Sequence, residues 1–192
     1  MHLQRGVTLI ELLVTISIGM VLLSIAAPSF QSFIAQNRVE TASGQLMASL
    51  AFARSEAIKR GARVTLCKSD NASTCGGTGW EDGWIIFMDS NRNGTRQASG
   101  VTPVESLLRV IAEQPSGVTI RGNSNFTNFI AYQPGGASNT IGSFAACNAD
   151  ILAGSRAIIV NVTGRPRLGR DTNSNNIPNK DDGNDIASCT NP

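Results

Sequence analysis

Residues 5–28, RGVTLIELLVTISIGMVLLSIAAP, decide how this chain is built. From Leu12 to Phe30 no residue is charged, and a helix of about 20 apolar residues spans the ~30 Å hydrocarbon core of a membrane. Glu11 stands at the start of this run, although an ionised carboxylate in hydrocarbon is costly unless it is compensated. The segment therefore predicts a membrane anchor that carries a carboxylate in need of a counter-charge.

Two kinds of N-terminal segment fit this hydropathy. An ordinary signal peptide would be cleaved after the apolar run, and SIAAPS (residues 24–29) weakly resembles such a cleavage site. Cleavage between Gly6 and Val7 would instead place Glu11 close to a new N-terminus. The α-amino group of a neighbouring subunit could then neutralise the Glu11 carboxylate, which offsets the desolvation of both charges. Glu11 favours the second interpretation and a role in assembly.

The string RGVTLIELLV (residues 5–14) resembles the class III signal sequence of type IV pilins and type II secretion pseudopilins. In that family a prepilin peptidase cuts after the glycine and methylates the new N-terminus. The apolar helix then remains as a membrane anchor and later forms the filament core. The resemblance implies a leader over residues 1–6, processing at Gly6 and Val7, and the inner membrane, prepilin peptidase and other pilins as partners.

Two further positions bear on this resemblance. Val7 stands where most members carry phenylalanine, and Pro28 falls where these helices commonly carry a proline. With Glu11, Pro28 is therefore an expected assembly residue.

After Pro28 the apolar pattern becomes that of a helix with one buried face. Six residues step by three and four positions, which is the spacing of one helical face: Val39, Ala42, Leu46, Leu50, Ala53 and Ala57. We expect one helix from about Val7 to Arg60, kinked near Pro28. Residues 7–30 would form its transmembrane half and residues 31–60 its amphipathic half.

Residues 61–192 are expected to form a β-rich globular head. Seven short β-rich runs are separated by turn clusters: residues 63–67, 83–89, 105–112, 117–121, 128–133, 143–147 and 156–162. A long helix with an antiparallel sheet makes an α+β fold. The stretch GWEDGWIIFMDSNRNGT (residues 79–95) resembles the Gly-Trp, apolar strand and Asp-x-Asn-x-x-Gly turn of the GspH/FimT group of minor pilins and pseudopilins, which implies the type IV pilin fold.

Four cysteines lie in the expected head: Cys67, Cys75, Cys147 and Cys189. After translocation they would lie in an oxidising compartment, where disulfides persist. Three pairings are possible. We favour Cys67 with Cys75, which closes a small loop, and Cys147 with Cys189, which anchors the C-terminal tail. A zinc site is the alternative, but no C-x-x-C motif or histidine ligand supports it.

The sequence lacks the groups that most enzymes need. Its single histidine, His2, lies in the expected leader. This excludes Ser-His-Asp and Cys-His catalysis and most zinc hydrolase mechanisms in the mature chain. The sequence also has no P-loop and no dinucleotide-binding fingerprint. We therefore expect a protein that is not an enzyme and needs no cofactor.

Two polar segments carry oxygen ligands of the kind that calcium prefers. In DSNRNGTRQASG (residues 89–100), Asp89, Asn91 and Asn93 have EF-hand-like spacing, but Gly100 occupies the closing position in place of glutamate. A turn at the end of a strand is the simpler interpretation of this segment.

The second polar segment, DTNSNNIPNKDD (residues 171–182), is the better calcium candidate. Its possible ligands are Asp171, Asn173, Asn175, Asn179 and Asp182. The segment has few carboxylates and lacks the usual turn glycine, so its affinity for calcium would be weak. A solvated polar loop is the alternative, and we expect no metal in the head.

Between Asp150 and Asp171 there is no acidic residue, and four arginines fall in this interval: Arg156, Arg165, Arg167 and Arg170. Guanidinium groups suit the recognition of phosphate, and Gly164 and Pro166 favour a turn that presents side chains. From these residues alone, a phosphate-binding surface and a solvated charged hairpin fit equally well.

A further resemblance bears on this choice. FimT-like minor pilins carry a Gly-Arg-x-Arg motif near the C-terminus, associated with DNA binding in natural transformation, and residues 164–167 are similar to it. The resemblance implies DNA binding by Arg165 and Arg167, with Gly164 in the same motif. From the four arginines themselves we expect contacts to the backbone of double-stranded DNA, which Arg170 and Arg156 would extend.

The family resemblance also implies a location. The chain would be anchored in the bacterial inner membrane with its head in the periplasm, and would lie in a surface pilus after assembly. The alternative function is that of a structural pseudopilin of a type II secretion system, or of a pilus-priming subunit without DNA binding.

Overall fold

A computed structural model describes residues 6–97, 104–180 and 182–192. The chain divides into two compact units, Met1–Ala35 and Gln36–Pro192. One helix, α1 (Leu9–Arg60), contributes to both units.

The first unit consists of the N-terminal part of α1. Among the described residues, α1 is the one helix that is long and apolar enough to cross a membrane. Glu11 lies in the first turn, where its backbone N–H donates to the hydroxyl oxygen of Thr8 at 3.3 Å. A carboxylate in this position also interacts favourably with the helix dipole. The helix continues through Pro28, and the kink expected there stays a prediction.

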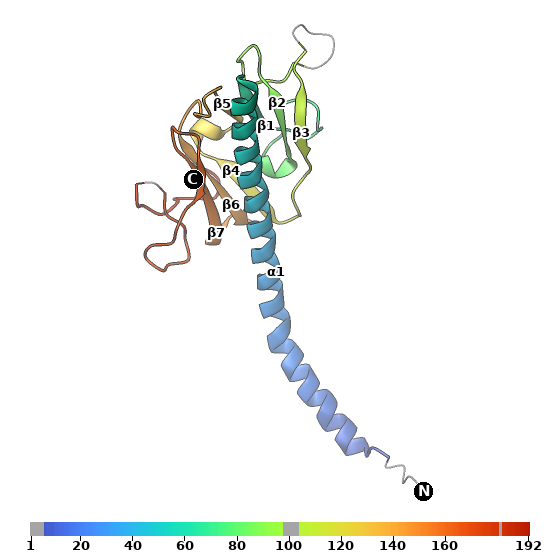
Figure 1. The fold of residues 1–192 in the computed structure, drawn as a ribbon. Coiled ribbons are helices and arrows are strands. Elements are labelled where there is room, and N and C mark those ends of the chain that lie inside the picture. Colours follow the sequence, from blue (N-terminus) through green and yellow to red (C-terminus); the bar gives the residue numbers. More distant parts are fainter. Residues whose placement is uncertain (1–5, 98–103, 181) are drawn as a thin grey trace. The chain divides into compact units, whose positions relative to one another are not determined.

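The second unit combines residues 36–60 of α1 with two antiparallel sheets (Figure 1). The first sheet has the strand order β3-β2-β1-β5 and the second has the order β4-β6-β7-β8. The strands are β1 (Val64–Lys68), β2 (Trp84–Met88), β3 (Leu107–Ile111), β4 (Val118–Gly122), β5 (Phe129–Tyr132), β6 (Gly142–Asn148), β7 (Ile151–Val160) and β8 (Pro166–Leu168). Two single-turn 3-10 helices, η1 (Trp80–Asp82) and η2 (Ser124–Phe126), lie in the connections.

The expected buried face of α1 is confirmed. All six residues of the stripe, from Val39 to Ala57, are 0–1% exposed, and they pack in one core with residues of both sheets. Figure 1 shows β1, β2 and β3 on one side of this part of the helix and β6 and β7 on the other. Small side chains such as Ala53 and Ala57 let the helix approach both sheets closely, so one helix face closes the largest of the buried apolar clusters.

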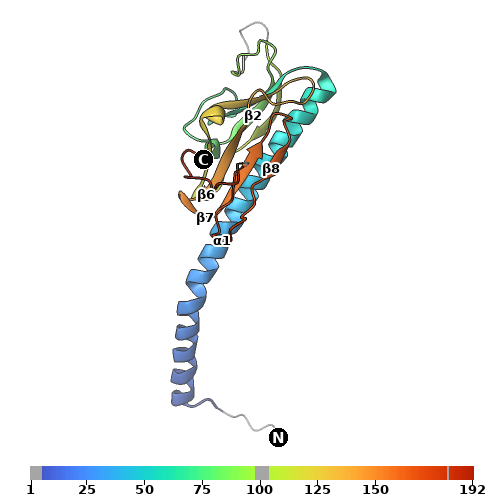
Figure 2. The ribbon, with the colours of Figure 1, turned by 90° about the vertical axis from the view of Figure 1, so that its left-hand side faces the viewer.

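Each of the seven expected β-rich runs contains a strand, and the structure adds one. Sequence reasoning assigned residues 164–170 to a turn, but Pro166–Leu168 forms β8, which pairs with the end of β7 at the edge of the second sheet (Figure 2). β7 is also longer than expected, because it begins at Ile151 rather than at Arg156. The C-terminal arginines therefore border a sheet edge.

The structure joins Cys67 to Cys75 and Cys147 to Cys189, which is the favoured pairing. The first disulfide links residues eight positions apart, and the second closes 42 positions. Cys147 is in β6 and Cys189 is in the C-terminal tail, so this bond holds the tail against the outer face of the second sheet.

Candidate functional site

The residues between β7 and the polar loop form what we call the arginine segment, residues 161–170. It begins with a turn in which the N–H of Gly164 donates to the carbonyl oxygen of Asn161 at 2.9 Å. Gly164 has a φ of 73°, which favours glycine. Arg165 follows this turn, Arg167 lies in β8, and Arg170 comes after β8; all three are exposed.

Gly164 is required by a close approach as well as by its φ. A Cβ at this position would overlap the carbonyl oxygen of Gly136 and lie 3.0 Å from the backbone nitrogen of Ser138 and from Cε1 of Tyr132. The hydroxyl of Ser138 donates to the carbonyl oxygen of Asn161 at 2.9 Å. The turn of the arginine segment is therefore packed against the connection between β5 and β6.

Tyr132 forms one side of the packing around Gly164. The residue is 0% exposed, and burial raises the pKa of its phenol well above the ordinary value, so the ring stays neutral. Because Tyr132 pairs with Val64 in the first sheet, the arginine segment at the edge of the second sheet rests on residues of the first.

The two faces of the second sheet separate the arginines. Residues directly opposite each other in an antiparallel pair point to the same face. Arg167 pairs with Ile159, which shares a face of β7 with Ala157, a residue packed against the C-terminal tail. Arg156 lies on the other face, with Ile158 of the helix-side core.

This geometry sets Arg156 apart from Arg167, and the expected surface of four arginines stays a prediction. The Nη2 atom of Arg156 lies 3.9 Å from Oε1 of Glu40 in α1, with side-chain exposures of 34% and 66%. The pair is weak because solvent screens it, but it places an acidic neighbour beside Arg156. Arg165, Arg167 and Arg170 are the exposed candidates for phosphate binding.

The polar segment that follows forms a loop with many internal hydrogen bonds, which we call the asparagine loop (residues 171–180 and 182–185). Two backbone bonds tie it to its neighbours: the N–H of Gly154 in β7 donates to the carbonyl oxygen of Asn176, and the N–H of Asn179 donates to that of Arg170, both at 2.8 Å. The carboxylate of Asp171 accepts the N–H of Asn175 and that of Asn176, at 3.3 and 2.8 Å. The side-chain oxygen of Asn179 accepts both the N–H and the hydroxyl of Thr172, at 2.8 and 2.9 Å. These bonds fix the loop through its own side chains.

Asp185, which sequence reasoning did not single out, is the central acceptor of this loop. The amide nitrogens of Asn173, Asn175 and Asn179 donate to its carboxylate. Asp182 instead accepts the N–H of Asn184 at 3.0 Å. Within the described ranges, no group of three or more acidic, cysteine or histidine side chains is arranged to hold a metal ion, so the calcium site stays a hypothesis.

The other calcium candidate, which begins at Asp89, is a turn at the end of β2. Oδ2 of Asp89 accepts the hydroxyl of Thr65 at 2.7 Å and the N–H of Gly94 at 3.2 Å, and lies 2.9 Å from Nε of Arg63. Gly100 lies outside the described residues. The structure adds Glu105, a buried residue whose carboxylate accepts backbone N–H groups of this turn.

With this geometry established, comparison with known families assigns the chain. The model described as "Type II transport protein GspH" matches residues 42–164, which is more than half of the chain. The chain belongs to the GspH family. A second model, the prokaryotic N-terminal methylation motif, matches residues 1–27. Comparison with curated proteins gives no match.

Solved structures show the same fold at low identity. A crystal structure of the type IV minor pilin FimU of Pseudomonas aeruginosa has a TM-score of 0.56 and 20% identity, and the match covers 82% of this chain and 98% of that one. A second crystal form of FimU gives a TM-score of 0.53 and 20% identity, with coverage of 78% and 98%. At this identity the likeness supports the pilin fold alone.

These findings establish the class of protein. The chain is a minor pilin or pseudopilin of a type IV pilus or a type II secretion system, with a pilin-like α+β fold and an inner-membrane N-terminal helix. The pilin family is structural rather than enzymatic, and membership implies other pilins and a prepilin peptidase as partners.

Proposed function

We propose that this GspH-family member is a FimT-like minor pilin of a type IV pilus that binds the backbone of double-stranded DNA and supports DNA uptake in natural transformation. Arg165 and Arg167 make the main phosphate contacts, and Arg170 extends them. The observation that carries the proposal is the exposure of these three arginines on a segment whose turn is anchored to the head. Pre-positioned guanidinium groups lose less freedom on binding a phosphate.

The proposed contacts determine how binding should depend on salt and sequence. Phosphate contacts carry little sequence information, so the head binds DNA of any sequence. Each phosphate contact adds roughly −0.9 to the slope of the logarithm of the binding constant against the logarithm of the salt concentration on duplex DNA. With at most three contacts a single head binds weakly, and several heads along one filament gain affinity through their linkage. The candidate residues are all arginines and include no aromatic side chain on which single-stranded bases could stack. Duplex DNA therefore binds at least as well as single strands.

The test is DNA binding by the full-length chain in a nonionic detergent, measured by fluorescence anisotropy at several salt concentrations. We expect the double variant Arg165→Gln/Arg167→Gln to lower both the affinity and the salt slope. Arg156→Gln is the control for the single variant Arg167→Gln, because each removes one positive charge and Arg156 lies on the opposite face of the sheet from Arg167. Binding by the double variant at parental strength would reject Arg165 and Arg167 as DNA contacts, and absence of binding by the parent would reject the DNA-binding function.

A structural role in filament priming or in a type II secretion pseudopilus is the second candidate. It is favoured by the family model itself, which is named for a type II transport protein. In that case the arginine segment is a solvated sheet edge. The parent then binds DNA only at background level, and neither the double variant nor Arg156→Gln changes that level.

Both functions require processing and assembly, for which we propose cleavage between Gly6 and Val7. Mass spectrometry of the mature N-terminus tests this site, and a terminus near Ala27 would indicate an ordinary signal peptide. We further propose that Glu11→Ala leaves membrane insertion intact but impairs entry into filaments, because insertion needs only hydrophobicity. Normal incorporation of that variant would remove the assembly role of Glu11.

A further inference from the structure

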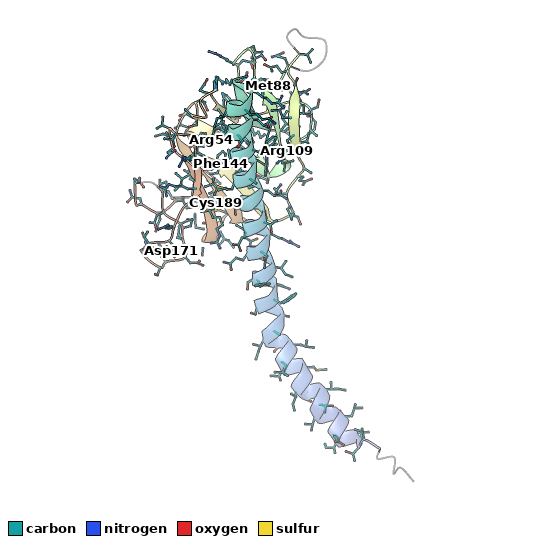
Figure 3. All side chains as sticks on the ribbon, in the orientation of Figure 1. Arg54, Met88, Arg109, Phe144, Asp171 and Cys189 are labelled. Carbon is teal, nitrogen blue, oxygen red and sulfur yellow. A yellow bond between two sulfur atoms is a disulfide. The ribbon has the colours of Figure 1, made fainter. Side chains whose placement is uncertain are left out.

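We propose that Arg54 of α1 is a positioning residue that orders the arginine segment, so that a side chain remote from the proposed DNA contacts sets their geometry. The inference rests on the proposed function for its biological meaning. The ordering itself can be measured without DNA. Figure 3 labels Arg54 on the part of α1 that belongs to the head.

The first observation is a bridge between two turns that are distant in sequence. The Nε–H of Arg54 donates to the carbonyl oxygen of Gly136 at 3.0 Å and to that of Thr163 at 3.3 Å. Gly136 ends the turn after β5, and Thr163 belongs to the turn that precedes Arg165. One guanidinium group therefore connects the helix, the β5–β6 connection and the arginine segment.

The second observation is that the same carbonyl of Gly136 forms the contact surface for Gly164. The position that a Cβ of Gly164 would occupy is taken by this oxygen, so the orientation of the Gly136 peptide decides where the chain can run after Thr163. Without Arg54 the two carbonyls lose their donor, and leaving a partly buried carbonyl unpaired costs about 1–3 kcal/mol. The Gly136 peptide is then free to turn, and the contact with Gly164 loosens.

The third observation concerns the choice of arginine. Arg54 is half-buried beside Tyr132, in a space bounded by the Gly136 and Thr163 carbonyls. A planar guanidinium group has its donors in fixed directions, whereas a lysine ammonium is a strongly hydrated point charge on a flexible stem. Arg54→Lys therefore keeps the charge near the DNA surface but loses the fixed bridge, which separates positioning from electrostatic attraction.

The experiment compares Arg54→Lys and Arg54→Gln with the parent, as full-length chains in nonionic detergent. Arg109→Gln is the matched control, because Arg109 is also a cation of the head but lies in β3 of the first sheet. Its guanidinium carbon lies 3.8 Å from the centre of the Phe52 ring. Amide order parameters and chemical shifts of Thr163, Gly164, Arg165 and Arg167 are measured by NMR without DNA. DNA affinity is measured by anisotropy.

We expect both Arg54 variants to lower the order of residues 163–167 and to weaken DNA binding by about fivefold, the equivalent of one hydrogen bond, whereas Arg109→Gln changes neither. Arg54→Lys with parental order and affinity would overturn the inference, as would unchanged order in Arg54→Gln. If the parent fails to bind DNA, the proposed function fails, and the NMR comparison alone decides whether Arg54 orders the segment.

Discussion

The arginine segment and the asparagine loop follow each other directly in the chain, but they are held in opposite ways. The turn of the arginine segment is fixed by groups from elsewhere: Arg54 of α1, the Gly136 carbonyl and the hydroxyl of Ser138. The asparagine loop is held mainly by its own side chains, which bond backbone groups two to five residues away and converge on Asp185. Two backbone bonds, from Gly154 to Asn176 and from Asn179 to Arg170, join it to β7 and to the arginine segment. The first depends on the tertiary structure and the second mainly on local sequence.

This difference is useful because each region suits its proposed task. A segment that must present arginines to a ligand gains from an external framework, since pre-organised groups lose less entropy on binding. The asparagine loop uses its oxygens internally, which leaves few of them for a cation. Four predictions test the comparison, in order of decreasing effect.

The largest effect is expected for Gly164→Ala, with Gly183→Ala as the matched control. Both glycines have a positive φ, 73° and 82°, but a Cβ at position 183 meets no atom within 4 Å. Left-handed backbone strain costs the control about 1 kcal/mol, whereas Gly164→Ala adds overpacking and loses on the order of 3 kcal/mol. Urea unfolding measures both. Equal losses would show that the contact with the Gly136 carbonyl relaxes at no cost.

The second prediction concerns Asn179, which is 5% exposed and bonds Thr172, Gly183 and Asp185. Asn179→Ala leaves these partners unpaired and destabilises the asparagine loop by about 1–2 kcal/mol. Hydrogen exchange should accelerate in residues 172–185 and stay at the parental rate in residues 163–167. Loss of protection in both ranges would mean that the two regions open together.

The third prediction is that calcium has little effect. The carboxylate of Asp171 and the amide oxygens of Asn173 and Asn175 already accept backbone N–H groups, so a cation must replace existing bonds. We expect no change in the thermal midpoint of the full-length chain at millimolar calcium. A rise in the midpoint that disappears in Asp171→Asn would instead establish a calcium site in the asparagine loop.

A small and local effect is expected from pH. Hydrogen bonds from Asn184 hold the pKa of Asp182 below its usual value. Because the pKa of Asp182 is lower in the folded state, its carboxylate stabilises the fold at any pH above the usual pKa. This contribution is lost as the pH falls through the lowered pKa. The amide shift of Asn184 should follow this titration, with no parallel change in the amide of Gly164. If the amide shifts of Asn184 and Gly164 changed together with pH, the asparagine loop and the arginine segment would not respond independently.

Several features of the fold could be predicted because they depend on neighbouring residues. The stripe from Val39 to Ala57 follows the helical period, and its burial is complete. The seven expected runs each contain a strand because apolar alternation and turn residues are local signals. The GspH-type segment at residues 79–95 likewise placed β2 and the turn at Asp89 correctly.

β8 shows where this reasoning stops. Pro166–Leu168 has a proline, an arginine and one apolar residue, and a short edge strand of this kind has no period to detect. It is a strand because Val160, Ile159 and Ile158 of β7 offer an unpaired edge. The same pairing places Arg156 and Arg167 on opposite faces of the second sheet, and no local sequence pattern predicts this.

The sequence by itself determined the apolar anchor with Glu11, the buried face of α1, the β-rich head and the set of arginines available to a phosphate. Each of these depends on composition or on spacings of two to four residues, which the chain carries whatever its tertiary structure. Only the tertiary structure decided which arginines share a surface, and that Arg54, Gly136 and Gly164 meet. Contacts of this kind join residues far apart in the chain, so their geometry exists only when the helix and both sheets have packed together.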